Sequence, residues 1–153
     1  MHTFRLAGRM ATLAAAAALI AGCDGSGDGQ KLENCWSPQT KQNVTSLAKE
    51  VVVEHIVDIV KKTNGSAVTA QRKSEIETAT NISLSNVYVA KRDTGADHLT
   101  CGATVNFTFT RGDKKTLNGN TSAEFDLFKA ENGYVTSIAK APLVLMVESA
   151  SAE

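Results

Sequence analysis

In the sequence Leu99–Thr110, LTCGATVNFTFT, two classes of side chain alternate. One set of positions is apolar or small: Leu99, Cys101, Ala103, Val105, Phe107 and Phe109. The intervening set is polar apart from Gly102. Because successive side chains of a strand point to opposite faces, the stretch predicts a strand with one buried and one polar face. Such a strand belongs to a sheet that is covered on one side only.

The sequence around this strand predicts an antiparallel meander of four or five strands. The preceding segment, Ile82–Ala90, also reads as a strand and is expected to bulge near Asn86. Turn residues separate the later segments, at Arg111-Gly112-Asp113 and at Asn132-Gly133. The later strands are predicted over Lys115–Lys129 with a bulge or bend at Gly119, over Tyr134–Ala141 and, beyond Pro142, over the apolar run Leu143–Val147.

A long helix before the sheet supplies the covering layer. Ser37 is a suitable N-cap, Pro38 suits the first helical position, and Asn64-Gly65 ends the helix. The polar segment Thr69–Thr80 is expected to form a short second helix. Apolar residues recur in the long helix at spacings typical of one helical face: Val44, Leu47, Ala48, Val51, Val52, Ile56, Ile59 and Val60. The predicted class is α+β, with this helix packed on an antiparallel sheet.

The N-terminal residues have the composition of an export signal. Arg5 and Arg9 precede an uncharged apolar stretch, Met10–Ala21, that is too short to cross a bilayer as a helix. The following residues, Ile20-Ala21-Gly22-Cys23, resemble the bacterial lipobox, in which the cysteine is acylated and the chain is cut just before it. The resemblance implies a lipoprotein. The alternative is a secreted protein whose Cys23 is a free thiol.

The lipobox resemblance implies a place and a domain organisation. Residues 1–22 would be a removed signal peptide, residues 23–31 the lipidated Cys23 and a flexible tether, residues 32–148 one domain, and residues 149–153 a disordered tail. More than one acyl chain gives stable anchoring in the cell envelope, with the domain facing the periplasm. Asp24 resembles the signal that keeps enterobacterial lipoproteins at the inner membrane, and the outer membrane stays open.

Cys35 and Cys101 are the two cysteines that remain once Cys23 carries lipid. An exported chain folds in an oxidising compartment, so we expect these two to form a disulfide. The bond would clamp the start of the helix to the central strand.

Charge and motifs argue against several classes of function. Removing Arg5 and Arg9 from the 16 basic residues leaves 14 basic against 16 acidic residues. This near-neutral balance lacks the excess of basic residues that is typical of nucleic-acid binding. The sequence holds no zinc spacing, no cofactor fingerprint and no nucleophile motif such as GxSxG. We therefore expect a protein without metal, cofactor or catalytic residues.

The order of one long helix and then a meander resembles cystatin-like and NTF2-like folds. Some NTF2-like enzymes use a histidine or a carboxylate in the cavity between helix and sheet, and His55 lies within or beside the apolar stripe. This resemblance implies a ligand-binding or general-base role for His55. A partly buried, hydrogen-bonded histidine is the alternative that we favour. His98 is expected in a solvated turn.

Two surfaces are candidates for binding a protein partner. Leu143–Val147 is either a buried last strand or an exposed edge open to strand addition. The other candidate is the polar face of the sheet, whose alternative is a merely solvated outer face. Its members are Thr104, Asn106, Thr108, Thr110, Ser122, Glu124 and Asp126, with Phe128 near its end.

Three functions from different classes are compatible with these features. Small one-domain lipoproteins of this design resemble immunity proteins against antibacterial effectors, inhibitors of envelope hydrolases and phage exclusion lipoproteins. A structural accessory of an envelope or secretion complex is the second possibility. The third is an NTF2-like enzyme or small-ligand binder that uses His55. The lack of a catalytic motif, the near-neutral charge and the small core favour the first two functions over the third. Of these two, we expect the inhibitor or immunity role.

Overall fold

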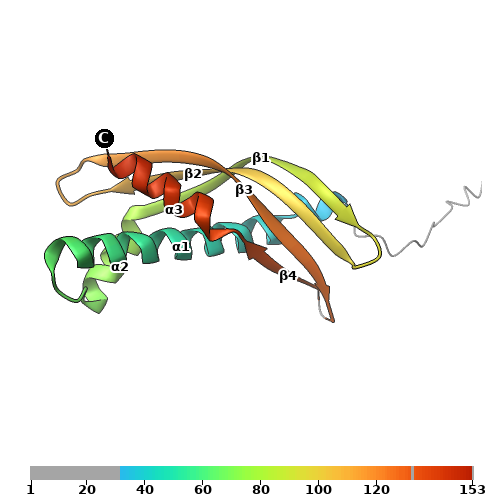
Figure 1. Ribbon diagram of the computed structural model, residues 1–153, viewed down its shortest axis with the longest axis horizontal. Helices are drawn as coiled ribbons and strands as arrows, with labels where there is room; N and C mark the ends of the chain where they lie inside the picture. Colours follow the sequence, from blue (N-terminus) through green and yellow to red (C-terminus); the bar gives the residue numbers. More distant parts are fainter. Residues whose placement is uncertain (1–31, 132, 153) are drawn as a thin grey trace, which may run out of the picture.

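The computed structural model describes residues 32–131 and 133–152 (Figure 1). The expected signal peptide, Cys23 and the tether lie outside these residues, as does Asn132. The elements in order are η1 (Leu32–Cys35), α1 (Pro38–Asn64), α2 (Ala70–Ala79), β1 (Thr80–Asp93), β2 (His98–Thr110), β3 (Thr116–Ala130), β4 (Gly133–Ile138) and α3 (Lys140–Ser151). The strands form one antiparallel sheet in the order β1-β2-β3-β4. The predicted α+β class and the meander are confirmed.

Local capping sets the ends of α1 and the start of α2. The Ser37 hydroxyl accepts a hydrogen bond from the Thr40 backbone N–H at 3.1 Å, and Pro38 is the first helical residue. At the other end Gly65 has a φ of +64°, and its N–H donates to the carbonyl of Lys61. This left-handed conformation is one that glycine adopts without strain. Both predicted helices are confirmed, α2 being capped by Thr69.

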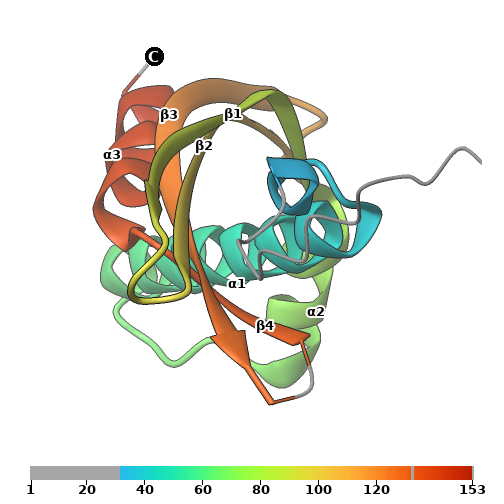
Figure 2. The ribbon, with the colours of Figure 1, turned by 90° about the vertical axis from the view of Figure 1, so that its right-hand side faces the viewer.

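The sheet arches over α1 in a second layer. Figure 2, viewed along the long axis, shows β1, β2 and β3 curving above α1, with α3 beside β3. Besides the sheet, α1 also contacts α2 and α3. Because α1 is packed on several sides, the consecutive residues Val51, Val52 and Val53 are all buried. Among the helices of the described ranges, none is long and apolar enough to span a membrane.

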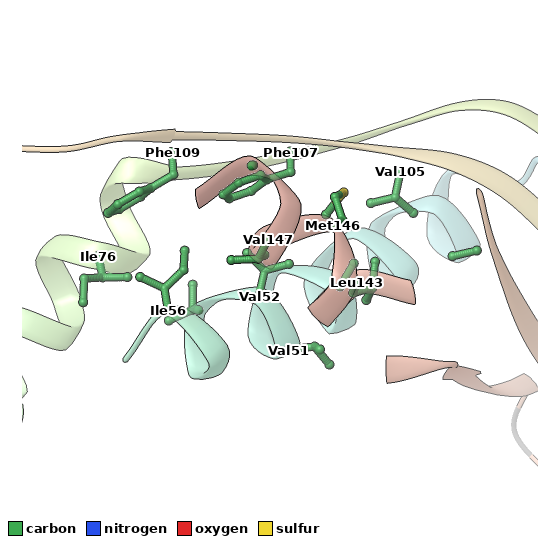
Figure 3. Close-up of a cluster of buried hydrophobic side chains, with 14 residues drawn as sticks. Val51, Val52, Ile56, Ile76, Val105, Phe107, Phe109, Leu143, Met146 and Val147 are labelled. Carbon is green, nitrogen blue, oxygen red and sulfur yellow. The ribbon is translucent and has the colours of Figure 1, made fainter. Parts of the chain in front are cut away.

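The apolar side chains of β2 form part of the core. Val105, Phe107 and Phe109 point from β2 toward Val52 and Ile56 of α1 (Figure 3). A second buried cluster surrounds the disulfide between Cys35 and Cys101, whose Cα atoms are 5.8 Å apart. This confirms the predicted bond. The cluster comprises Cys35, Val44, Leu99, Cys101, Ala103, Phe125 and Leu127.

The prediction of a last strand at Leu143–Val147 is wrong, because these residues belong to α3. The buried residues of α3 are Leu143, Met146, Val147 and Ala150, which is helical spacing. Pro142 lies in the first turn of α3, where its missing N–H has no helical partner to lose. The prediction of a tail from 149 is also wrong, since α3 runs to Ser151. The idea of an open edge at Leu143–Val147 is withdrawn with the strand.

Two predictions about irregular strand positions have opposite outcomes. The bulge near Asn86 is confirmed, because the β1–β2 register shifts between Ser85 and Tyr88, and Asn86 has a φ of +51°. At Gly119 a bulge is not present, since the β2–β3 register continues through it. A Cβ on Gly119 would lie only 3.0 Å from the Met146 Cγ atom. Glycine at this position therefore allows α3 to pack closely on β3.

Candidate functional site

The polar positions of the sheet come together on its outer face, opposite the helices. Side chains of β1, β2 and β3 line up in rows across the sheet. The reason is that Thr104–Phe109 of β2 pair without a register shift with both β1 and β3. Every member is Ser, Thr or Asn, and we call the set the polar array: Asn81, Ser83 and Ser85 on β1, Thr104, Asn106, Thr108 and Thr110 on β2, and Thr116, Asn118, Asn120 and Ser122 on β3.

Hydrogen bonds between strands order part of the polar array. The Asn106 Nδ2 atom donates to the Ser85 hydroxyl at 3.1 Å. Next to the bulge, the Asn86 Nδ2 atom donates to the Thr104 hydroxyl at 3.3 Å. These contacts hold the amide groups across the gap between β1 and β2. The array is thus an organised surface of uncharged donors and acceptors.

An aromatic cluster continues the same face toward the end of the fold that carries η1. Pairing places His98 of β2 beside Phe128 of β3, and Phe128 beside Val135 of β4. The His98 and Phe128 rings stack with centroids 4.5 Å apart and planes 4° from parallel. Phe128 is 43% exposed and Val135 57% exposed. With Tyr88, described below, these three residues form what we call the aromatic corner.

Asp126 fixes the imidazole of the aromatic corner. Its Oδ1 atom accepts hydrogen bonds from the His98 Nε2 atom and the Thr100 hydroxyl, both at 2.8 Å. In a catalytic triad the imidazole lies between the acid and the hydroxyl, whereas here the hydroxyl bonds the carboxylate directly. The arrangement therefore orders a surface and does not activate Thr100. The expectation that His98 is solvated in a turn is wrong, since it begins β2 and is partly buried.

Tyr88 joins this surface because of the bulge in β1. After the register shift Tyr88 pairs with Gly102, which in turn pairs with Glu124 of β3. A Cβ on Gly102 would overlap the Tyr88 ring, so the ring lies across the bare backbone of this glycine. Tyr88 still remains 47% exposed. Glycine at this position therefore lets a large aromatic surface lie against the sheet.

Trp36 lies at the edge of the sheet next to the bulge. The disulfide of Cys35 holds the preceding residue against β2, and the Trp36 Nε1 atom donates to the carbonyl of Val87 at 2.9 Å. The indole ring is itself exposed. An exposed aromatic side chain with a satisfied N–H is a frequent feature of interfaces.

His55 lies away from this surface, between two helices. Its Nε2 atom is 3.4 Å from the Glu148 Oε1 atom of α3, outside hydrogen-bond geometry. The side chain is mostly buried, as the structural interpretation predicts, but the expected hydrogen bond of Nε2 is not formed. Over residues 32–131 and 133–152, no group of three or more His, Cys, Asp or Glu side chains could hold a metal ion.

The residues that the sequence identified as one face are brought together by the structure: Thr104, Asn106, Thr108, Thr110, Ser122, Glu124, Asp126 and Phe128. The sequence did not identify the members of the polar array on β1, or Thr116, Asn118 and Asn120 on β3. It also did not identify Tyr88, His98, Thr100 or Val135 as part of this face. The register of β2 with β3 could have identified His98 and Thr100. The turn after Thr110 pairs Thr110 with Thr116. Continuing this antiparallel register away from the turn places Thr100 opposite Asp126 and His98 opposite Phe128.

Comparison with known proteins adds no assignment to this geometry. No protein-family model, curated protein or solved structure matches the chain. The function must therefore be argued from the polar array, the aromatic corner and the lipobox resemblance.

Proposed function

We propose that this chain is a lipid-anchored, non-enzymatic protein-binding module that faces the periplasm and holds its partner on the outer face of the sheet. Its role would be that of an inhibitor or immunity protein, which neutralises an antibacterial effector or an envelope hydrolase. The observation that carries the proposal is the open sheet face, in which an ordered aromatic corner adjoins an uncharged polar array.

The size of this face suits a protein partner. Within residues 32–131 and 133–152, no helix lies against it (Figure 2). β2 has 13 residues. A rise of about 3.4 Å per residue and a strand spacing of about 4.8 Å give three such strands a flat area of about 600 Å². A typical specific interface buries about 800 Å² on each partner, so this face with β4 at its end comes close to that area.

The chemistry of the face also suits a protein. Binding energy at interfaces concentrates in a few aromatic and other large side chains, surrounded by polar groups that exclude water. Phe128, Tyr88 and His98 supply such large side chains at the η1 end of the face. Because Asp126 already holds the His98 ring, less side-chain freedom is lost when a partner binds. The polar array offers hydrogen bonds without a net charge.

Anchoring fits this role physically. Confinement near the bilayer raises the effective concentration of the module where an incoming protein acts. The lipobox resemblance of Ile20-Ala21-Gly22-Cys23 supports the anchor, and Asp24 favours the inner over the outer membrane. The helix-on-sheet layering supports the resemblance to cystatin-like and NTF2-like folds.

Replacing the lipidated cysteine tests the anchor. The full precursor carrying Cys23→Ser is expected to leave the detergent phase and the membrane fraction, because no thiol remains to be acylated. The matched variant Ser26→Ala, which changes the proposed tether and leaves the cysteine, should stay in the membrane fraction. Phase partitioning followed by immunoblotting measures both. Membrane retention of the Cys23→Ser variant would contradict the proposal.

Variants of the sheet face test the binding role. The full lipidated chain in detergent serves as bait for secreted proteins and for an envelope extract of the source organism. We expect one secreted protein to bind, with Phe128→Ala weakening its affinity by about thirtyfold, as the loss of about 2 kcal/mol at an interface centre implies. Thr108→Arg, which places a long charge in the polar array, should weaken binding as well.

Leu145→Ala is the matched control for these variants. Leu145 is an exposed apolar residue on α3, away from the sheet face, so the affinity should change by less than about twofold. Equal effects of Leu145→Ala and Phe128→Ala would show that the face is not the binding surface. Recovery of membrane-complex subunits in place of a secreted protein would favour the accessory role.

A further inference from the structure

A cavity opens at the end of the fold that carries α2, opposite the end with η1 (Figure 1). It lies where the last turns of α1, the end of β2 and the end of α3 diverge, and its volume is about 500 Å³. This is within the range of small-molecule sites, about 300–1,000 Å³. Its floor consists of Phe107, Phe109, Ile56 and Val147, which belong to the main core (Figure 3). The cavity therefore lies directly over apolar side chains of the core.

The rim of this cavity is polar and carries charges of both signs, whose pairing leaves guanidinium N–H donors unused. Two guanidinium groups lie there, Arg72 on α2 and Arg111 after β2, against one carboxylate, Asp113. The Arg111 Nε atom is 3.9 Å from the Asp113 Oδ1 atom, which is a loose ion pair. Arg72 donates a hydrogen bond to Glu75, and this bond lowers the pKa of the exposed Glu75 carboxyl. Each guanidinium has five N–H donors, so one carboxylate does not exhaust them.

We propose that this cavity binds a free fatty-acid anion, with its alkyl chain on the apolar floor and its carboxylate between Arg72 and Arg111. An apolar floor below two guanidinium groups with unused N–H donors suits a ligand that is apolar along its length and anionic at one end. A carboxylate at the rim stays in contact with water, so it avoids the large penalty of a buried charge. Arginine matches the planar carboxylate with two parallel hydrogen bonds.

This site is separate from the proposed protein-binding face. The aromatic corner lies at the η1 end of the sheet, and the cavity lies at the α2 end. His55 does not line the cavity either. The inference therefore depends neither on the membrane anchor nor on a protein partner, and its test can fail while the proposed function stands.

A chain-length series tests the apolar floor. Residues 23–153 carrying Cys23→Ser, used to avoid detergent, are titrated calorimetrically with saturated carboxylates of 8, 10 and 12 carbons below their micellar concentrations. Each buried methylene contributes about 0.8 kcal/mol, which is about fourfold in affinity, so each step of two carbons should tighten binding about fifteenfold. No binding of any of the three, or affinities independent of length, would overturn the proposal.

A matched pair of tryptophan variants tests the location. Thr63 lies at the mouth of the cavity, is exposed, and donates its hydroxyl to the carbonyl of Ile59 in α1. Thr78 is likewise exposed and makes the equivalent bond to Ser74 in α2, but it does not line the cavity. Thr63→Trp should abolish binding and Thr78→Trp should leave it unchanged, with thermal unfolding confirming that both variants fold. Binding that survives Thr63→Trp would place the ligand elsewhere.

The headgroup is tested by comparing each acid with the alcohol of the same length. The carboxylate should bind at least tenfold more tightly, and Arg111→Gln should remove that difference while leaving the alcohol unaffected. Equal affinities of acid and alcohol in the unsubstituted protein would overturn the role of the rim. Tighter binding of a lysophospholipid of the same chain length would assign the site to a membrane lipid and contradict the free fatty acid.

Discussion

Replacing both Cys35 and Cys101 by alanine is expected to lower the free energy of unfolding by about 4 kcal/mol. The two residues are 66 positions apart in sequence, so the bond closes a long loop and removes much conformational freedom from the unfolded chain. Both cysteines are fully buried and form the centre of the second core cluster. Equilibrium unfolding in urea, followed by circular dichroism, measures the difference.

Reduction of the unsubstituted protein provides the matched control. Under reducing conditions the unsubstituted chain should unfold close to the midpoint of the double variant, because both then lack the same cross-link. The double variant itself should be insensitive to reductant. A loss smaller than about 1 kcal/mol would mean that the unfolded chain is already restricted by residual structure, which would contradict the entropic account.

Leu143→Ala is expected to destabilise the domain by about 2–5 kcal/mol, and Leu145→Ala by less than about 0.5 kcal/mol. Leu143 is fully buried between α1 and the sheet, whereas Leu145 is 61% exposed. The same urea titration measures both variants. Comparing the two variants distinguishes a helix from a strand over this segment. In a strand, residues two positions apart share a face, so both substitutions would have similar effects. Equal losses would contradict α3.

The ends of α1 could be predicted because their causes are local. Ser37 and Gly65 act through hydrogen bonds to residues three and four positions away, which the sequence displays directly. Strand β2 could be predicted for a similar reason, since apolar or small side chains occupy every second position from Leu99 to Phe109. These local patterns were sufficient for the two-layer α+β arrangement.

α3 could not be predicted in the same way because Leu143–Val147 has an apolar side chain at every position and therefore no period. What decides its conformation is the surrounding structure. β4 pairs only with Phe125–Ala130 of β3, which leaves the rest of the β3 edge for another element. α3 packs there, and Gly119 lets it approach.

The candidate site likewise has a part that the sequence predicted and a part that it did not. The members of the polar array on β2, and Ser122 on β3, follow from alternation within single strands and were predicted. Its members on β1, and Thr116, Asn118 and Asn120 on β3, were not. The aromatic corner depends on register across four strands and on one irregularity. Without the bulge at Asn86, Val87 would oppose Gly102, and Tyr88 would point toward the covered face. One extra residue in β1 therefore determines whether Tyr88 lies on the outer face of the sheet. The sequence predicted a bulge near Asn86 but not this consequence for Tyr88.

The disulfide also determines how mechanical tension would travel through this domain. In a chain pulled at its N-terminal end while a partner grips β2 and β3, the load would pass at Cys35 directly through a covalent bond into Cys101 of β2. The segment between the two cysteines, which contains α1, α2 and β1, would lie outside that path. A domain anchored as proposed would therefore resist being pulled away from the membrane without relying on the strength of its helix packing.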